Sequence, residues 1–269
     1  MCIRDSLLQA PMKNKRILGF DPAFRTGCKL AVIDESGKKL TVDVIYPHPP
    51  VAKVKESEKK LVDLCTKYDV NLIAIGNGTA SRESEAFVAN TIKKYHLPVS
   101  YTIVSEAGAS VYSASKLAIE EFPDLHVEQR SAISIARRLL DPLSELIKID
   151  PQSIGVGQYQ HDLPTTQLKE RLNFVVEKAV NLVGVNINTA SPTLLKNVSG
   201  LTQATANSIV AYREENGKIM SRKEMEKIPK IGPKAYQQAA GFLRIEEGSE
   251  PLDLSLIHIS EPTRRTPIS

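Results

Sequence analysis

The chain has 269 residues, of which 42% are hydrophobic and 25% are charged, and its formal net charge is +4. This length and composition allow two globular domains with separate cores and exclude a disordered protein. The mild basic excess is concentrated between residues 181 and 247, so any phosphate contact is expected in that part of the chain.

No apolar run is long enough to span a bilayer, and no secretory leader opens the chain. We therefore expect a cytoplasmic protein without a membrane partner. The cysteines, Cys2, Cys28 and Cys65, lack C-x-x-C spacing, which argues against a disulfide framework or a zinc site. Residues 1–12 and 248–269 are expected to be artefactual or disordered ends, because stretches of both resemble translated sequencing-adapter DNA.

The first domain is expected over residues 13–145. Apolar runs predict three strands joined by tight turns, an antiparallel meander, at 17–20, 28–33 and 40–46. Strand and helix patterns then alternate: a helix from about Val54, a strand at 72–75, a helix at 82–95 capped by Ser81, a strand at 99–104, and helices at 110–121 and 131–140. A meander extended by helix-connected strands predicts an α/β ribonuclease H-like fold.

Residues 146–183 are predicted to form a linker and a bridging helix, because apolar residues between 164 and 183 step by three and four. Residues 184–247 then favour an all-α tandem helix-hairpin-helix domain. Its two turns read V-S-G-L at 198–201 and I-P-K-I-G-P-K at 228–234.

Each turn contains a glycine, Gly200 or Gly232, that lets the backbone turn tightly before a helix whose first N–H groups suit a phosphate oxygen. The predicted nucleic-acid-binding residues are Lys196, Gly200, Leu201, Lys230, Ile231, Gly232 and Lys234. The second turn is favoured because the first has no basic residue of its own. Such contacts carry no base code, so binding should be independent of sequence and should weaken with salt.

Nucleases with a ribonuclease H-like fold use three or four carboxylates to hold two divalent metal ions. Asp21 and Glu106, each placed just after a predicted strand, fit two of these positions. The third is expected near 129–134, where the sequence is Q-R-S-A-I-S, and only Glu128 just upstream could substitute. Because an arginine there would repel a cation, we expect no nuclease activity and no required cofactor, with at most weak Mg²⁺ binding by Asp21 and Glu106.

A structural interpretation of both carboxylates is also open, with Asp21 as a turn residue before Pro22 and Glu106 at a helix start. The segment G-N-G-T at 76–79 is similar to a phosphate-cradling loop. It lacks the lysine and the spacing of a nucleotide P-loop, so a plain strand-to-helix turn is favoured there.

Three long motifs, F-D-P-A-F-R-T-G-C-K at 20–29, G-N-G-T-A-S-R-E at 76–83 and S-E-A-G-A-S-V-Y-S-A-S at 105–115, resemble the bacterial Tex family of transcription accessory proteins. The segments at 137–146 and 148–162 and the two turns extend the resemblance over nearly the whole chain. It implies a YqgF-like, resolvase-type ribonuclease H domain followed by tandem helix-hairpin-helix motifs, within a longer protein.

Together these patterns predict a non-catalytic scaffold in bacterial transcription that binds the phosphate backbone of RNA or DNA, with the transcription machinery as a further partner. Two alternatives remain open. One is a metal-dependent resolvase or ribonuclease that uses Asp21, Glu106 and Glu128, and the other is a protein-docking module of the transcription machinery.

Overall fold

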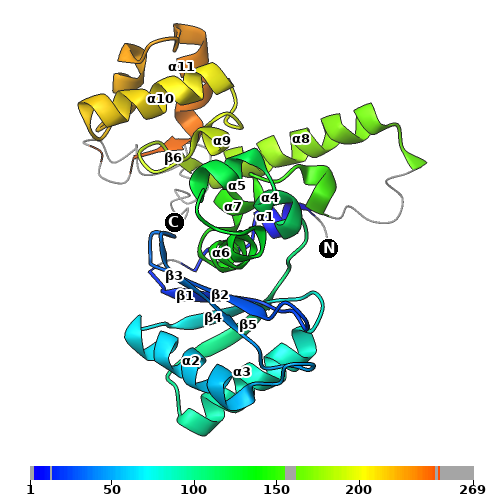
Figure 1. The fold of residues 1–269 in the computed structure, drawn as a ribbon. Coiled ribbons are helices and arrows are strands. Elements are labelled where there is room, and N and C mark those ends of the chain that lie inside the picture. The colour runs from blue at the N-terminus through cyan, green and yellow to red at the C-terminus, as the bar shows by residue number, and fades with distance from the viewer. Residues whose placement is uncertain (1–2, 13, 155–161, 246–247, 249–269) are drawn as a thin grey trace, which may run out of the picture. The chain divides into compact units, whose positions relative to one another are not determined.

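The computed structural model describes residues 3–12, 14–154, 162–245 and 248. These residues fall into two compact units (Figure 1). The described residues of Gln9–Val156 form the first, and those of Cys2–Leu8 and Gly157–Ser269 form the second. Residues 155–161 of the expected linker, and the expected tail apart from Gly248, lie outside the described residues.

The first unit is built on a five-stranded sheet with the strand order β3-β2-β1-β4-β5. β1 pairs antiparallel with β2, and β2 with β3, whereas β4 is parallel to both β1 and β5. This mixed sheet confirms the predicted ribonuclease H-like plan. The strands are β1 (Ile17–Asp21), β2 (Cys28–Ile33), β3 (Lys39–Ile45), β4 (Leu72–Gly76) and β5 (Ser100–Val104).

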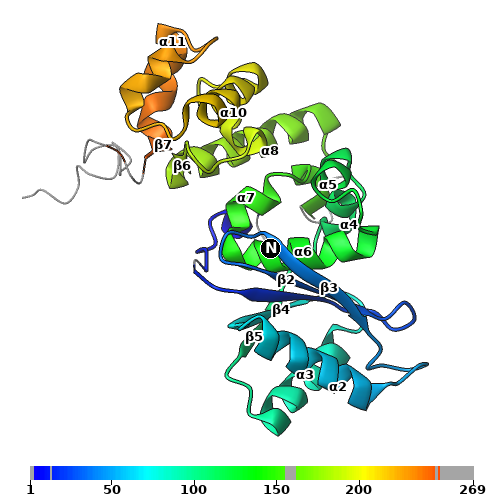
Figure 2. The same ribbon diagram turned by 60° about the vertical axis from the view of Figure 1, so that its left-hand side comes forward.

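Helices cover both faces of this sheet, as Figures 1 and 2 show. α2 (Val54–Lys67) and α3 (Ser81–Tyr95) pack on one face, where Leu18 and Phe20 of β1 are buried. α6 (Val127–Leu140) packs on the other face against Ile17 and its neighbours. Successive residues of a strand point to opposite faces, so β1 contributes to both cores.

Helix starts in this unit differ from the sequence prediction at two places. Ser81 does not cap α3: it is the first helical residue and follows Ala80, whose left-handed φ of 63° turns the chain into the helix. α6 begins at Val127, four residues before the predicted start, and Gln129 Oε1 accepts a hydrogen bond from His126 N at its N-terminus. The earlier start places Glu128 in the first turn of α6.

The helix expected over 110–121 is two short helices, α4 (Ala109–Ser113) and α5 (Lys116–Glu121). Ser115 interrupts it, because its extended backbone caps α5 and its hydroxyl accepts a hydrogen bond from Ala118 N. This agrees with the preference of serine for N-cap positions over helix interiors.

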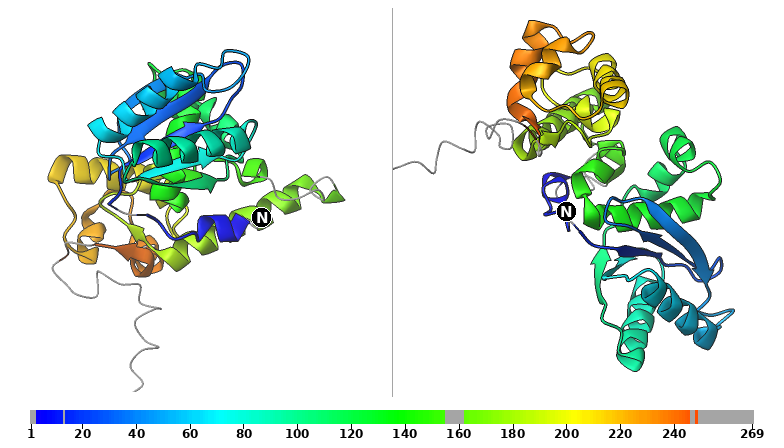
Figure 3. Two further views of the ribbon diagram at one scale, coloured as in Figure 1. Left: turned by 90° about the horizontal axis from the view of Figure 1, so that it is seen from below. Right: turned by 90° about the vertical axis from the view of Figure 1, so that its left-hand side faces the viewer.

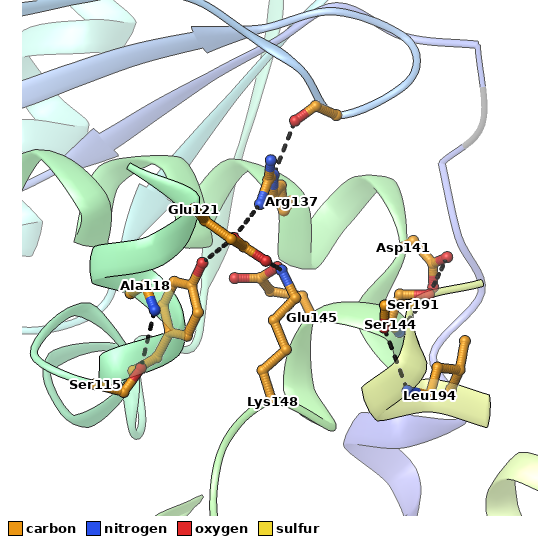
Figure 4. A network of polar contacts seen from close by, with 12 residues as sticks. Ser115, Ala118, Glu121, Arg137, Asp141, Ser144, Glu145, Lys148, Ser191 and Leu194 are labelled. Carbon is orange, nitrogen blue, oxygen red and sulfur yellow. Dashed lines mark hydrogen bonds and ion pairs between the residues drawn. The ribbon is translucent and has the colours of Figure 1, made fainter. Parts of the chain in front are cut away.

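A polar network surrounds Glu121 at the end of α5 (Figure 4). Its carboxylate accepts hydrogen bonds from Tyr112 Oη at 2.5 Å, Arg137 Nη1 at 3.0 Å and Lys148 Nζ at 2.9 Å. Lys148 also pairs with the buried Glu145 of α7 (Pro142–Leu146). One carboxylate therefore ties together α4, α6 and the segment after α7.

The second unit is helical, as predicted, and also contains one short parallel pair of strands. In that pair, Val185 faces Leu243 and Asn186 faces Arg244, so the start of the hairpin region is joined to its end. Its elements are α1 (Ile3–Leu7), α8 (Thr165–Val183), β6 (Val185–Asn186), α9 (Pro192–Leu195), α10 (Gln203–Asn216), η3 (Arg222–Lys227), α11 (Pro233–Ala239), η4 (Ala240–Phe242) and β7 (Leu243–Arg244).

α1 belongs to the second unit although it comes first in the chain. It lies along α8, the long helix predicted from the spacing of its apolar residues (Figure 3). Ile3 and Leu7 are buried there, so part of the N-terminal end that the sequence predicts to be artefactual or disordered forms a packed helix. Within the described part of the chain, none of the helices is both long and apolar enough to cross a membrane.

Candidate nucleic-acid interface and carboxylate site

The two predicted turns are repeats of one structure, offset by 30 residues. Leu201 N donates to Val198 O at 3.0 Å, and Ile231 N donates to Ile228 O at 3.2 Å. All four side chains are buried, so Leu201 and Ile231 anchor their turns in the core of the unit.

The two turn glycines are not equivalent. Gly200 has a left-handed φ of 84°, and the residue 30 positions later that shares this conformation is Lys230, with φ 69°. Gly232 instead corresponds to Thr202, and both are N-cap residues, of α11 and α10 respectively. The sequence motif had paired Gly200 with Gly232 because glycine is the visible common feature.

The surroundings of these glycines also differ. A Cβ on Gly200 would lie 2.6 Å from Gln238 Cβ and 3.2 Å from Ala235 O, because α11 packs against the first turn. A Cβ on Gly232 would meet nothing within 4 Å. The first glycine is needed for packing, whereas the second faces open space.

The first turn is also fixed to α8 through Ser199. The backbone N of Ser199 donates to Asn181 Oδ1 at 3.1 Å, and its hydroxyl donates to Glu177 Oε1 at 2.8 Å. Asn181 Nδ2 donates in turn to Ser199 Oγ at 2.9 Å. These bonds place the exposed carboxylate of Glu177 beside the first turn, where it would repel a phosphate.

The predicted lysines are all exposed. Lys230 occupies the second turn and Lys234 lies in the first turn of α11, whereas Lys196 follows α9 on the first hairpin. At the start of α10, Thr202 Oγ1 accepts from Thr205 N, and Thr202 N donates to Thr205 Oγ1. The N-cap residue of α11, Gly232, has no side chain that could cap the helix, so the second hairpin combines an open glycine, a helix start without an N-cap side chain and two lysines.

In the first unit, Asp21 lies at the end of β1 on the side that α6 covers. α6 approaches this strand closely: a Cβ on Gly19 would lie 2.0 Å from Ala132 O. Ser131, one residue earlier on α6, lies near the Asp21 carboxylate, and its hydroxyl lowers the pKa of that group. The serine therefore stands where a third carboxylate would be expected.

The pKa of Asp21 is raised to about 6. Burial of the carboxyl is the main cause, and the negative charges of Glu106 and Glu128 act in the same direction. The Ser131 hydroxyl and the positive charge of Lys29 oppose the shift.

Glu106 lies against the loop after β4. A Cβ on Gly78 would lie 1.6 Å from Glu106 Oε1, and one on Gly76 would lie 2.7 Å from Glu106 Oε2. Asn77 Oδ1 also accepts a hydrogen bond from Glu106 N at 3.0 Å. The G-N-G segment is thus a strand-to-helix turn whose glycines make room for the Glu106 carboxylate.

Glu128, the expected substitute for a third ligand, pairs instead with a lysine. Lys29 Nζ lies 2.5 Å from Glu128 Oε2 and also donates to Thr26 O and Thr26 Oγ1. Lys29 lies opposite Asp21 in the β1–β2 register and is 4% exposed. Sequence reasoning missed Lys29 and Ser131, although the pairing of Asp21 with Lys29 could have been found by extending the β1–β2 register.

These residues do not fit a divalent metal ion. Mg²⁺ needs several oxygen ligands in a near-octahedral arrangement. Here an ammonium group holds Glu128, and a serine takes the position next to Asp21. Among the described residues, no three His, Cys, Asp or Glu side chains are grouped so that they could hold a metal.

Comparison with known proteins agrees with this architecture. The chain matches the Tex protein YqgF-like domain over residues 15–140 and the helix-hairpin-helix motif over residues 180–244. The fold and its turns define a YqgF-like ribonuclease H-fold domain followed by a helix-hairpin-helix region.

The chain belongs to the Tex family. It is 60% identical to YdcI of Bacillus subtilis, over 95% of this chain and 36% of that protein. It is 52% identical to the transcriptional accessory protein Tex of Neisseria gonorrhoeae, over 95% and 33%. It is 46% identical to S1 RNA-binding domain-containing protein 1 of Homo sapiens, over 91% and 25%. The chain therefore spans only about a third of the length of the two bacterial relatives and a quarter of that of the human relative.

Proposed function

We propose that this chain is a non-catalytic scaffold that binds the phosphate backbone of RNA or DNA without sequence preference and acts in transcription in the cytoplasm. The helix-hairpin-helix match and the transcriptional accessory name of the Neisseria relative support this proposal. The observation that carries it is the second turn, where Gly232 faces open space between the exposed Lys230 and Lys234.

This turn suits a phosphate for three physical reasons. The absence of a side chain at Gly232 lets an oxygen reach the backbone, the start of α11 adds a partial positive charge, and the two lysines attract the anion. None of these groups reads a base edge. Binding should therefore be independent of sequence and should fall steeply as salt rises.

The first turn has a structural role, and the second turn is the one assigned to phosphate binding. Gly200 packs against α11, and Glu177 brings a negative charge close to Ser199. Lys196 adds only a peripheral charge there. The phosphate contact is accordingly assigned to Lys230, Ile231, Gly232 and Lys234, and Gly200 and Leu201 maintain the fold of the pair.

Two matched variants test this assignment. Gly232→Asp and Thr202→Asp place the same carboxylate at equivalent N-cap positions of the two hairpins. Aspartate is a favourable N-cap residue, and Gly232 has an extended backbone with φ −85° and ψ 171°, so both variants should fold. Binding to labelled single-stranded RNA and duplex DNA is measured across a salt series, with circular dichroism as the folding control.

We expect Gly232→Asp to weaken binding by about tenfold or more and Thr202→Asp by about twofold or less. Equal losses from both variants would contradict the assignment to the second hairpin. If the unaltered chain shows no salt-dependent binding, the protein-docking alternative replaces this proposal. Metal-dependent cleavage of either probe would instead favour the nuclease alternative.

A further inference from the structure

Lys29 is a buried cation in the carboxylate site of the first unit, which consists of Asp21, Glu106 and Glu128. It projects from β2 opposite Asp21, and its ammonium group contacts Glu128 Oε2, Thr26 O and Thr26 Oγ1. Only 4% of its surface is exposed. A buried lysine needs such partners, because an isolated ammonium group is strongly disfavoured away from water.

The geometry places this charge where a metal ion would have to bind. Directly opposite residues in an antiparallel pair have neighbouring side chains on the same face, so Lys29 is adjacent to Asp21. The same ammonium holds Glu128 from the first turn of α6. A divalent ion between these carboxylates would meet a fixed positive charge at short range.

We infer that Lys29 is the resident cation of this carboxylate site: its ammonium group takes the place of a divalent metal, joins β2 to α6 through Glu128, and lies beside Asp21 of β1. Ser131 completes the substitution, because a neutral hydroxyl stands next to Asp21 where a metal site would use a carboxylate. The carboxylate site then has a structural role. This inference is independent of phosphate binding by the hairpins.

The test uses Mn²⁺ as the probe and thermal unfolding of the full 269-residue chain as the readout. Without Lys29, Glu128 loses its cationic partner, and its negative charge becomes available to a metal together with those of Asp21 and Glu106. In EDTA, Lys29→Met should unfold at a lower temperature than the unaltered chain. Mn²⁺ at millimolar concentration should then raise its Tm by about 3 °C or more.

Two controls separate this effect from the loss of any ion pair. Lys29→Arg keeps a positive charge, so Mn²⁺ should leave its Tm unchanged. Lys94→Met breaks the pair between Lys94 and Glu58, which frees a single carboxylate, and it should gain no response to Mn²⁺.

The unaltered chain provides a test that needs no variant. If it binds Mn²⁺ in calorimetry with a sub-millimolar Kd at this carboxylate site, the inference is wrong. It is also overturned if Lys29→Met folds and shows no stabilisation by Mn²⁺. If Lys29→Met does not fold in EDTA, recovery of its folding on addition of Mn²⁺ supports the inference. If Mn²⁺ does not restore folding, the neutral, hydrogen-bonding variant Lys29→Gln is tested in the same way. Failure of Mn²⁺ to restore the folding of both variants contradicts the inference.

Discussion

Lys230 and Gly200 occupy equivalent positions in the two hairpins, and both have left-handed backbone conformations, with φ of 69° and 84°. For glycine this conformation carries no steric cost, whereas a lysine there is strained. The lysine therefore combines an unfavourable backbone with a side chain exposed on the turn assigned to phosphate binding.

Lys230→Gly should change stability and binding in opposite directions. Relief of the left-handed strain should raise the free energy of unfolding by about 0.5–1 kcal/mol, measured by urea denaturation. Loss of the charge should weaken nucleic-acid binding and reduce the slope of log K against log salt by about 1. Unchanged binding in this variant would show that Lys230 does not contribute to nucleic-acid binding.

Gly200→Ala should destabilise the second unit. The added Cβ would lie 2.6 Å from Gln238 Cβ, and the left-handed φ is unfavourable for alanine. We expect a loss of about 2 kcal/mol or more in urea denaturation. Gly232→Ala is the matched control: its Cβ meets nothing within 4 Å and φ is −85°, so its stability should change by less than about 1 kcal/mol.

Removal of the negative charge beside the first turn should strengthen binding. Glu177→Gln keeps an oxygen that can accept the hydrogen bond from Ser199 Oγ. At low salt we expect affinity for nucleic acid to rise by about twofold, with the difference disappearing at high salt as the charge is screened. A gain that persists in high salt would require another explanation.

Ionisation of Asp21 should lower the free energy of unfolding as pH rises. Its pKa is about 6 in the folded chain against 3.8 for an ordinary aspartate, so the folded state binds the proton more tightly. The cost of ionising this carboxyl begins as pH rises above about 4 and is complete above about 6. Asp21→Asn should therefore be more stable than the unaltered chain at pH 7.5, by about 1–3 kcal/mol, with no gain at pH 4.

Glu121 should have the opposite pH dependence. Burial raises the pKa of this carboxyl, but the charge of Lys148 and the hydrogen bonds from Tyr112 and Lys148, with the charge of Arg137, outweigh that effect and lower it overall. The stabilisation is present above the unfolded pKa and is lost as pH falls through the folded value. Thermal unfolding of Glu121→Gln should show a lower Tm than the unaltered chain at pH 7 and a smaller difference at pH 3.

Much of the first unit could be predicted from the sequence because its signals are local. The strand at 28–33 was predicted with its observed ends, and the alternation of the later strands and helices gave the fold class. Helix starts were less accurate. The left-handed turn at Ala80 and the cap at Ser115 depend on single backbone conformations that periodicity does not reveal.

By itself, the sequence determined the ribonuclease H-like plan, the hairpin region, the family and the candidate residues, because apolar periodicity and motifs depend only on residues that are near one another in the sequence. The tertiary structure decided how those residues are used. It placed Lys230 rather than Gly232 in the position of Gly200, because backbone conformation defines that equivalence. It also brought Lys29 and Ser131 to Asp21 and Glu128, because strand register and the close approach of α6 at Gly19 join parts of the chain that no sequence pattern connects.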